Sequence, residues 1–264
     1  MIRSVWFGLV TVAASAWFST LAIAGGLFRA PHRWYDRVHR GWARALLRAA
    51  GVRVEVVGLE NFVSGGPRIL VANHQSTFDI LALFAALPVS IRFVAKRELA
   101  RIPLFAGAMR AAGHVFIDRG DRRRSVEAIR AAEDRMRREG FSLGLFPEGT
   151  RSRDGALREF KKGSIVLAIE TQLPLVPVAI DGGWRLVSRG RLRPGPVRIR
   201  IADSVPTAGR TAGDRDEVLR TVREEVRRLL AETRREAGDP TPLEPRSGAF
   251  RAPDPERPLT DGPA

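Results

Sequence analysis

The chain has 264 residues, of which 44% are hydrophobic, and it contains no cysteine. This length suits one sizeable α/β domain with appended segments, and the absence of cysteine excludes disulfide bonds, thiolate metal sites and cysteine nucleophiles. The formal net charge is +15, and only three of the 44 basic residues are lysine. So large a surplus of positive charge favours anionic partners: nucleic acid, anionic lipid headgroups or phosphorylated substrates.

The N-terminal run Val5–Phe28 carries no charged residue. A helix of this length can cross a hydrocarbon core of about 30 Å. Ala22-Ile23-Ala24 resembles a signal-peptide cleavage site, but only Arg3 precedes the run, which is also longer than the apolar core of most signal peptides. We therefore predict a membrane anchor, which either spans the bilayer or forms a monotopic hairpin with the next helix.

The segment Arg29–Arg53 contains seven arginines and one aspartate. Apolar residues recur in it at helical spacing: Trp34, Val38, Trp42, Ala45 and Ala49. This pattern predicts a basic amphipathic helix that lies in an anionic membrane interface, so that residues 1–50 form a membrane-binding element. The alternative is a helix that packs on its own domain and leaves its basic face in water. The arginine excess places the following domain on the cytoplasmic side of the cell membrane.

Residues 51–237 alternate between short β-rich and longer helical segments. The expected strands are Val52–Val57, Arg68–Ala72, Ile91–Ala95, Gly113–Ile117, Ser142–Phe146, Leu175–Ile180 and Val197–Ile201. The expected helices are Phe78–Ala86, Leu99–Ala112, Asp121–Glu139, Gly163–Glu170 and Asp214–Glu236. This alternation predicts an α/β domain with a central, mostly parallel or mixed sheet flanked by helices. Residues 238–264 are rich in proline and poor in large apolar residues, which predicts a disordered tail.

His74 follows a buried-strand pattern and precedes a helix that starts near Ser76. Its candidate partner is Asp79, which could meet it only if His74 lies ahead of the helix and Asp79 in its first turn. The carboxylate would then hold one imidazole nitrogen and leave the other to accept a proton. A simpler reading remains open, because Ser76-Thr77-Phe78-Asp79 matches a capping box in which Asp79 only caps the helix.

Three later segments combine a predicted strand with residues that could belong to a site. Phe116–Arg119 ends one strand in an arginine, and Phe146–Ser152 ends another in a glycine turn with adjacent Glu148 and Arg151. Leu173–Val178 is a strand whose prolines favour a sheet edge or a bulge. Each segment alone is also compatible with an ordinary structural role.

Together with Asn73–Asp79, these segments resemble in order and separation the four motifs of the glycerolipid acyltransferase family, specifically the bacterial 1-acylglycerol-3-phosphate acyltransferases. Asn73–Asp79 resembles the family's His-x4-Asp motif, and the last motif corresponds to Val176-Pro177-Val178. The resemblance spans roughly residues 73–180 and rests on general organisation elsewhere.

This resemblance implies transfer of an acyl chain from acyl-CoA or acyl carrier protein to lysophosphatidic acid, giving phosphatidic acid. It implies that His74 is the general base, oriented by Asp79, and that five residues bind the glycerol phosphate: Arg119, Glu148, Gly149, Thr150 and Arg151. Arginine can clamp a phosphate bidentately, whereas Glu148 would accept a hydrogen bond or position Arg151.

The developing oxyanion needs hydrogen-bond donors, for which Lys96 and backbone amides near Gly149 are candidates. Lys161 and Lys162 could attract an acidic donor, although a solvated helix start explains them equally well. No metal and no cofactor apart from the acyl donor is expected. The expected partners are membrane lipids, lysophosphatidic acid and the thioester donor.

Three other functions compete with this one. The first is the same chemistry on another lyso-acceptor, such as a lysophospholipid or a lyso-aminolipid. The second is nucleic-acid binding through the positive charge, which the lack of an aromatic–basic stacking platform disfavours. The third is an inactive membrane scaffold, which the intact His74–Asp79 spacing disfavours.

Overall fold

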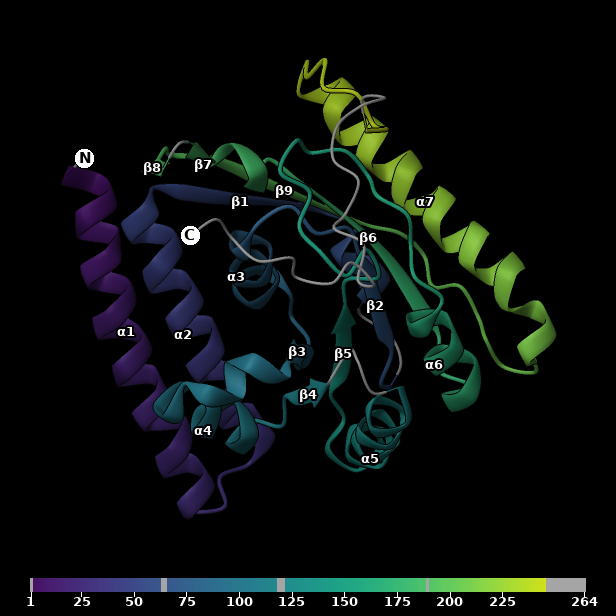
Figure 1. Cartoon of the computed structure of the whole chain (residues 1–264), viewed down its shortest axis with the longest axis horizontal. Coiled ribbons are helices and arrows are strands. Elements are labelled where there is room, and N and C mark those ends of the chain that lie inside the picture. The colour runs from purple at the N-terminus through teal and green to yellow at the C-terminus, as the bar shows by residue number, and fades with distance from the viewer. Residues whose placement is uncertain (1, 63–65, 118–121, 189, 246–264) are drawn as a thin grey trace, which may run out of the picture.

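The computed structural model describes residues 2–62, 66–117, 122–188 and 190–245, without the side chains of residue 96 and of residues 122–130. A seven-stranded sheet in the order β1-β9-β6-β2-β5-β3-β4 forms its centre (Figure 1). The strands are β1 (Val52–Val57), β2 (Ile69–Ala72), β3 (Ile91–Lys96), β4 (Val115–Ile117), β5 (Ser142–Leu145), β6 (Leu175–Asp181) and β9 (Gly195–Ile201). These are the seven strands that the sequence predicts. The short strands β7 (Val187–Ser188) and β8 (Arg191–Leu192) form a separate hairpin.

Seven α-helices surround the sheet in the described part of the chain. They are α1 (Ile2–Leu27), α2 (His32–Ala50), α3 (Thr77–Ala86), α4 (Pro103–Ala111), α5 (Arg122–Glu139), α6 (Gly163–Thr171) and α7 (Arg215–Glu236). Short 3-10 helices are η1 (Leu59–Phe62), η2 (Arg97–Arg101), η3 (Gly183–Arg185) and η4 (Ala212–Asp214). The helix expected over Leu99–Ala112 is divided into η2 and α4 at Ile102, since a residue before proline disfavours the α conformation.

The sheet is mixed, as the sequence predicts. Strands β6, β2, β5, β3 and β4 run parallel to one another, whereas β9 is antiparallel to β6 and β1 runs parallel to β9. The carboxyl ends of β2, β5 and β3 therefore meet at one edge of the sheet. In open α/β sheets this is the edge where reactive groups gather.

Two apolar cores cover the two faces of the sheet. On β2, Leu70 and Ala72 face a core shared with α2 and α3, and Ile69 and Val71 face a core shared with α5, α6 and α7. All four β2 residues are buried. A strand covered on both faces is expected to be apolar throughout, and this explains why β2 reads as a continuous hydrophobic run.

Strand β6 is not an edge strand, because it lies between β2 and β9 and is buried along its whole length. The alternative expectation of a bulge is confirmed: Val178 pairs with Ile201 but Leu175 pairs with Val205, so one extra residue lies in the partner segment opposite Val176 and Pro177.

The ladder of β6 with β9 runs from Val178 to Asp181. The carbonyl of Pro177 accepts a hydrogen bond of 3.0 Å from the N–H of Ala202, just beyond the end of β9. Pro177 has no N–H to donate, but it lies one residue outside this ladder. Proline therefore removes none of the ladder hydrogen bonds and is tolerated in a central strand.

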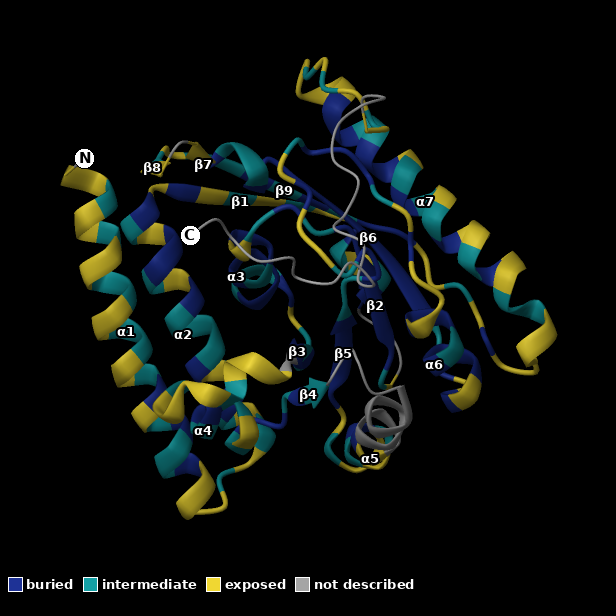
Figure 2. Ribbon diagram, in the orientation of Figure 1, coloured by how far each residue is buried: buried dark blue, intermediate teal, exposed yellow. Residues whose placement is uncertain are grey.

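Helix α2 packs on its own domain, which is the alternative left open by its sequence. Its buried residues are Tyr35, Val38, Ala43, Leu46, Leu47 and Ala50, which lie against α1, α3 and β1 (Figure 2). The predicted stripe through Trp34 and Trp42 faces α1: the indole N–H of Trp34 donates to the Leu21 carbonyl, and that of Trp42 to Ser15 Oγ, each at 3.1 Å. The exposed apolar surface belongs instead to α1.

The start of the predicted disordered tail is ordered. The carbonyl of Leu243 accepts a 2.7 Å hydrogen bond from Leu157 N, and Leu243 packs against the core beneath α7. The guanidinium of Arg234 donates to the carbonyls of Thr241 and Pro242. Residues up to 245 therefore belong with the folded domain, and residues 246–264 lie outside the described part.

Candidate active site

The turn between β2 and α3 is fixed to the neighbouring strand. The side chain of Asn73 accepts a hydrogen bond from the N–H of Ile180 at 2.7 Å and donates one to its carbonyl at 2.8 Å. Asn73 is buried, so this bidentate pair holds the chain rigidly where β2 ends. His74 follows directly and lies two residues before Ser76, the N-cap of α3. His74 therefore lies ahead of the helix, as its pairing with Asp79 requires.

Asp79 contacts His74 and caps the helix at the same time. Its Oδ2 lies 2.8 Å from His74 Nδ1 and accepts hydrogen bonds from the N–H groups of Gln75, at 2.6 Å, and Ser76, at 2.8 Å. The capping box is also present, so the two readings of Asp79 are not exclusive. Asp79 is fully buried, and the carboxylate assigns the proton of His74 to Nδ1.

The imidazole of His74 is clamped in one orientation. It stacks on the ring of Phe146 with centroids 4.0 Å apart, and Phe146 stacks on Phe93 at 5.7 Å. The carbonyl of His74 accepts a 2.7 Å hydrogen bond from Ser152 N. The side chain remains 14% exposed, and none of the described residues hydrogen-bonds to Nε2. An unprotonated, accessible Nε2 can act as a base.

Glu148 lies behind His74 rather than on the surface. Its Oε1 accepts a 2.9 Å hydrogen bond from the backbone N–H of His74, and no described group hydrogen-bonds to its buried Oε2. Burial raises the pKa of Glu148 to about 8, against the lowering effect of the His74 N–H. The structure therefore places Glu148 at the site as a largely protonated carboxyl near neutral pH. The protonated carboxyl carries little negative charge. It supports the turn between β2 and α3 that carries His74, which we call the base turn.

The turn after Glu148 carries the exposed residues Thr150 and Arg151. Nη1 of Arg151 donates to Thr77 Oγ1 at 2.9 Å, which brings the guanidinium to the N-terminal end of α3. Gly149 has φ +71, and a Cβ atom there would lie 3.2 Å from the side chain of Lys161. A helix N-terminus with an adjacent arginine attracts anions, since the helix dipole and the guanidinium act in the same sense.

Two predicted site residues cannot be placed. Arg119 lies outside the described residues, as does the side chain of Lys96. The backbone of Lys96 ends β3, and its partner across the ladder is Ile117 at the end of β4.

Sequence reasoning missed Gly183, which touches the carboxylate of Asp79. A Cβ atom at Gly183 would lie 2.6 Å from Asp79 Oδ1 and 3.1 Å from Ser76 Cβ. Oδ1 is buried and has no hydrogen bond among the described residues. Gly183 lies in η3, far from Asp79 in the sequence, and no local pattern signals this contact.

A buried polar network behind the site was also missed. Asp181 Oδ1 accepts hydrogen bonds from Gln75 Nε2 at 3.1 Å and from Arg234 Nη2 at 3.0 Å. Arg234 also donates to the carbonyl of Gly155 at 2.6 Å. Asp181, Gln75 and Arg234 are all nearly inaccessible. Arg234 continues the four-residue spacing of Val218, Val222, Val226 and Leu230. A charged residue in this apolar stripe is the sequence signal that could have suggested such a network.

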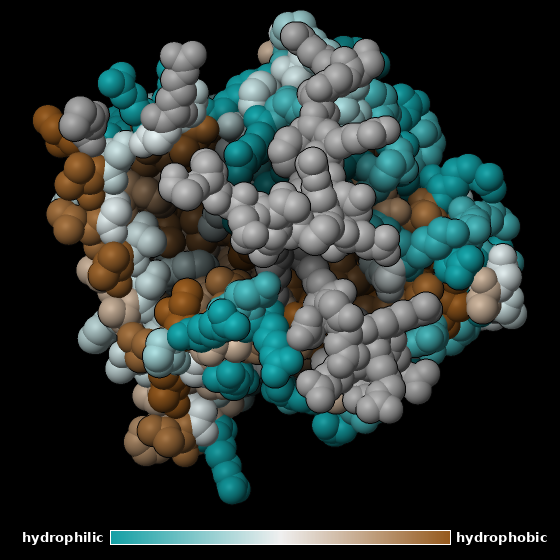
Figure 3. All heavy atoms as spheres, in the orientation of Figure 1, coloured by the Kyte–Doolittle hydropathy of each residue, from teal (hydrophilic) through white to brown (hydrophobic). Residues whose placement is uncertain are grey.

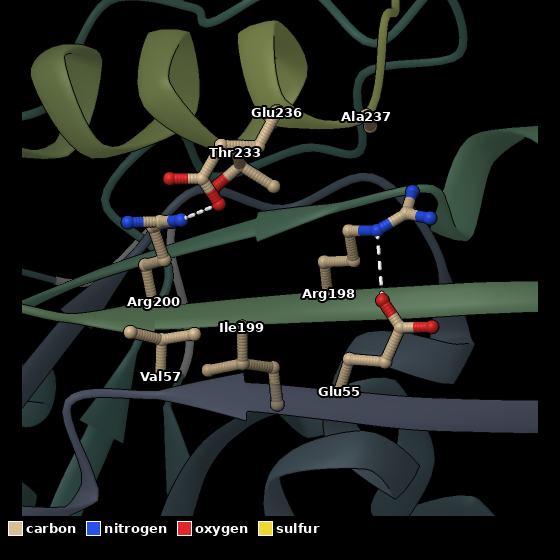
Figure 4. Close-up of a pocket in the computed structure, with 8 residues that line it drawn as sticks. All are labelled: Glu55, Val57, Arg198, Ile199, Arg200, Thr233, Glu236 and Ala237. Carbon is tan, nitrogen blue, oxygen red and sulfur yellow. Dashed lines mark hydrogen bonds and ion pairs between the residues drawn. The ribbon is translucent and has the colours of Figure 1, made fainter.

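A separate hollow of about 260 Å³ lies between β1, β9 and α7 (Figure 4). Arg198 pairs with Glu55 at 2.9 Å, and Arg200 pairs with Glu236. On β9 these arginines point away from the face that packs on α3, since Val197, Ile199 and Ile201 occupy that core. The hollow is thus separated by the sheet from the face that carries α3, and its charges are already neutralised within the protein.

The family model for acyltransferases matches residues 53–181. A putative 1-acyl-sn-glycerol-3-phosphate acyltransferase from Caenorhabditis elegans is 35% identical over 171 residues, covering 64% of this chain and 61% of the relative. The human 1-acyl-sn-glycerol-3-phosphate acyltransferase alpha is 34% identical over 170 residues, covering 62% and 59%. The chain thus spans about three fifths of the length of these curated relatives.

A solved structure extends the similarity to the fold. The crystal structure of the 1-acyl-sn-glycerophosphate acyltransferase PlsC from Thermotoga maritima matches with a TM-score of 0.75 and 28% sequence identity. The match covers 88% of this chain and 95% of that one, so it includes helices and strands well outside the motifs. Motifs, family model and fold agree, and residues 53–181 form a domain that matches the acyltransferase family.

Proposed function

We propose that this chain transfers an acyl group from a thioester to the free hydroxyl of lysophosphatidic acid and forms phosphatidic acid. The observation that carries the proposal is the His74–Asp79 contact at 2.8 Å, with Nε2 of His74 accessible. The family and its relatives support the acyl chemistry. The Arg151 guanidinium beside the α3 N-terminus supports an acceptor that carries a phosphate.

In the proposed reaction the acceptor hydroxyl attacks the thioester carbonyl while Nε2 of His74 takes its proton. The hydrogen bond from Nδ1 to Asp79 stabilises the imidazolium that forms. Collapse of the tetrahedral intermediate breaks the carbon–sulfur bond, and the imidazolium returns the proton to the leaving thiolate. The reaction requires no metal or cofactor apart from the thioester, which is acyl-CoA or acyl carrier protein.

The proposal assigns six further residues to the acceptor phosphate, the oxyanion and the support of the base. Arg151 and Arg119 are proposed to bind the phosphate, and Thr150 and the Gly149 amide lie in the same turn as Arg151. Lys96 remains a proposed donor to the oxyanion. Glu148 positions the backbone of His74 through the 2.9 Å hydrogen bond.

Membrane association is proposed through the outer face of α1. Among the described residues, α1 is the helix long and apolar enough to cross a bilayer, and it forms an edge of the molecule that hydrophobic atoms follow (Figure 3). Its inner face, however, packs on the domain throughout: Ser4 meets β8, Phe7 stacks on Phe78, and Ser15 meets α2. We therefore propose that α1 lies in one leaflet, on the cytoplasmic side, instead of spanning the bilayer.

The decisive experiment supplies labelled acyl-CoA and several lyso-acceptors to the wild type and to His74→Ala. We expect the wild type to acylate lysophosphatidic acid and the variant to lose the activity while remaining folded and membrane-bound. Wild-type turnover in His74→Ala would refute the base assignment. Faster acylation of another lysophospholipid or of a lyso-aminolipid would instead assign the chain to that acceptor.

A further inference from the structure

Two of the four histidines form a pair that the proposed reaction does not use. Nε2 of His39 lies 3.1 Å from Nε2 of His114, and Nδ1 of His114 accepts a 3.0 Å hydrogen bond from the backbone N–H of Phe93. His39 belongs to α2, His114 directly precedes β4, and Phe93 belongs to β3. Three separate segments of the chain therefore meet at this pair.

The hydrogen bonds fix the tautomer of each ring. Because His114 Nδ1 accepts from Phe93 N, the proton of the neutral His114 ring lies on Nε2 and is donated to His39 Nε2. His39 therefore carries its own proton on Nδ1, which is buried and has no hydrogen bond among the described residues. An added proton on either ring would set two donors against each other. Burial favours the same neutral state, since it lowers the pKa of His114 to about 3 and the pKa of His39 well below its usual range.

His114 satisfies a backbone group at the point where β4 begins. Strands β3 and β4 pair from Val94 and Val115 onward, so the buried Phe93 lies one residue ahead of the ladder. Without the imidazole of His114, the Phe93 N–H would be left without this partner inside the protein. The backbone N–H of His114 is bound at 2.9 Å to the carbonyl of Met109 in α4, so the ring extends from a fixed point of the backbone.

A row of stacked rings leads from this point to the base. Phe93 stacks on Phe146 with centroids 5.7 Å apart, and Phe146 stacks on the imidazole of His74 at 4.0 Å. Phe93 also makes a T-shaped contact of 5.1 Å with Phe84, which stacks on His39 at 4.5 Å. We call Phe84, Phe93 and Phe146 the ring row. The histidine pair thus holds the ring row through both a backbone hydrogen bond and a stacked ring.

Gly144 of β5 allows the Phe93 ring to reach Phe146. Phe93 and Gly144 are partners in the β3–β5 ladder, and a Cβ atom at Gly144 would lie 2.5 Å from the Phe93 ring. The ring therefore lies against the backbone of β5, at a place where any side chain would displace it. Phe93 is held from two directions, by this glycine and by His114.

We propose that His39 and His114 are positioning residues, which act through the ring row on the orientation of His74. The inference rests on the proposed function, which makes His74 the base. Asp79 holds one nitrogen of the imidazole, and the ring row holds its plane, so that Nε2 points in one direction. A base turned out of line lowers the rate without lowering substrate affinity, because the proton transfer takes place only in the transition state.

Substitutions at His39 separate the hydrogen bond from the packing of the ring. His39→Gln keeps an acceptor, whereas His39→Phe keeps a ring against Phe84 but leaves the buried N–H of His114 without a partner. With lysophosphatidic acid as acceptor, we expect kcat of His39→Phe to fall roughly tenfold or more with little change in KM. His39→Gln should keep most of the wild-type kcat.

Val38→Ala is the matched control, because it removes buried atoms from the same turn of α2 outside the ring row. It is expected to lower the melting temperature and to leave kcat near the wild-type value. The proposal is overturned if Val38→Ala lowers kcat as much as His39→Phe does, since the pair would then act on stability alone. It is also overturned if His39→Gln is as slow as His39→Phe.

A spectroscopic measurement tests the pair without catalysis. The chain has only four histidines, so the ring signals of the ¹⁵N-histidine-labelled chain in detergent micelles can be assigned by substituting each in turn. In the wild type we expect neutral rings with the proton on Nδ1 of His39 and on Nε2 of His114. The His74 ring signals should shift in His39→Phe and stay in place in Val38→Ala.

Two outcomes of this measurement contradict the proposal. One is a wild-type His114 that titrates as a free imidazole, with a pKa of about 6.5, and the other is a His74 whose signals do not respond to His39→Phe. If the rings behave as expected in a wild type without acyltransferase activity, the proposed function fails and the coupling of the pair to His74 stands.

Discussion

Asp79 serves two purposes through one oxygen atom. Oδ2 accepts from His74 Nδ1 and from the N–H groups of Gln75 and Ser76, and the latter two bonds hold the start of α3. Both purposes require an acceptor at this position, but only the first requires a negative charge. Substitutions that keep or remove the acceptor can therefore separate them.

Asp79→Asn should keep the fold and lose the activity. The amide oxygen can still accept the backbone hydrogen bonds, but it carries no charge to stabilise an imidazolium and can favour the wrong tautomer. By analogy with a catalytic triad we expect kcat to fall by roughly 10³–10⁴, with a small change in KM. Asp79→Ala should in addition lower the free energy of unfolding by about 1 kcal/mol or more, because the cap is lost.

Steady-state kinetics and thermal melting in detergent micelles measure these two effects. If Asp79→Asn retained more than about a tenth of the wild-type kcat, the carboxylate would be a cap alone and not the orienting partner of the base.

Glu148 couples the stability of the site to pH. Its pKa is raised by burial to about 8, so the folded chain holds this proton more tightly than the unfolded chain. The associated stability is present in full below about pH 4.5 and is lost as the pH rises through about 8. Because at most one proton is involved, the free energy of unfolding changes by at most about 1.4 kcal/mol for each pH unit.

Glu148→Gln should flatten this dependence. Glutamine keeps an oxygen that can accept from His74 N and has no proton to release. We expect the melting temperature of the wild type to decline more steeply than that of the variant between pH 6 and pH 8. Parallel melting curves over this range would show that Glu148 is not the titrating group.

At the scale of the elements, α7 is joined to the active site by a buried ion pair. Arg234 on α7 and Asp181 at the end of β6 are 3% and 0% exposed, and Gln75 of the base turn hydrogen-bonds to the same Asp181 oxygen. Helix α7 therefore does more than cover one face of the sheet. It fixes Gly155, in the loop that follows Arg151, through the 2.6 Å hydrogen bond to the Gly155 carbonyl.

Breaking this pair from one side should destabilise the domain strongly. Arg234→Met leaves the buried Asp181 carboxylate with only the more distant cation of Arg185, whose Nη1 lies 3.9 Å from Oδ2. Removing one partner of a buried ion pair costs about 3–5 kcal/mol, and Arg185 is expected to keep this loss near the lower figure. The double variant Arg234→Met/Asp181→Leu removes both charges and should recover most of this loss in chemical denaturation. The loss in free energy of unfolding of the double variant could instead equal the sum of the losses of the two single variants. The hydrogen bonds to Gly155 and Gln75, and not the charge pair, would then account for most of the stabilisation.

At the scale of the whole molecule, the +15 charge is partly concentrated next to α1. Arg33, Arg37, Arg44 and Arg48 are exposed and fall within about 60° on one side of α2. No acidic partner for them occurs among the ion pairs of the described residues. An apolar helix beside a row of arginines suits an interface of acyl chains and anionic headgroups.

Removing two of these arginines should weaken binding to anionic vesicles. Each arginine near such a surface contributes about 1 kcal/mol, so Arg33→Gln/Arg44→Gln is expected to lose roughly 25-fold in partition coefficient. The control Arg220→Gln/Arg235→Gln changes the net charge equally on α7 and should lose far less. A vesicle sedimentation assay at two salt concentrations measures both variants, and equal losses would assign the effect to net charge alone.

The sequence by itself determined the strands, most helices, the mixed sheet and the pairing of His74 with Asp79. These depend on local periodicity and on residues close together in the chain, where spacing limits the geometry. The tertiary structure alone decided that α2 packs inward and that β6 is central. It also decided that Gly183 lies against Asp79 and that Arg234 reaches the base turn. Each of these depends on which distant segment supplies the neighbouring surface, and an amphipathic pattern shows that a face is apolar without showing what covers it.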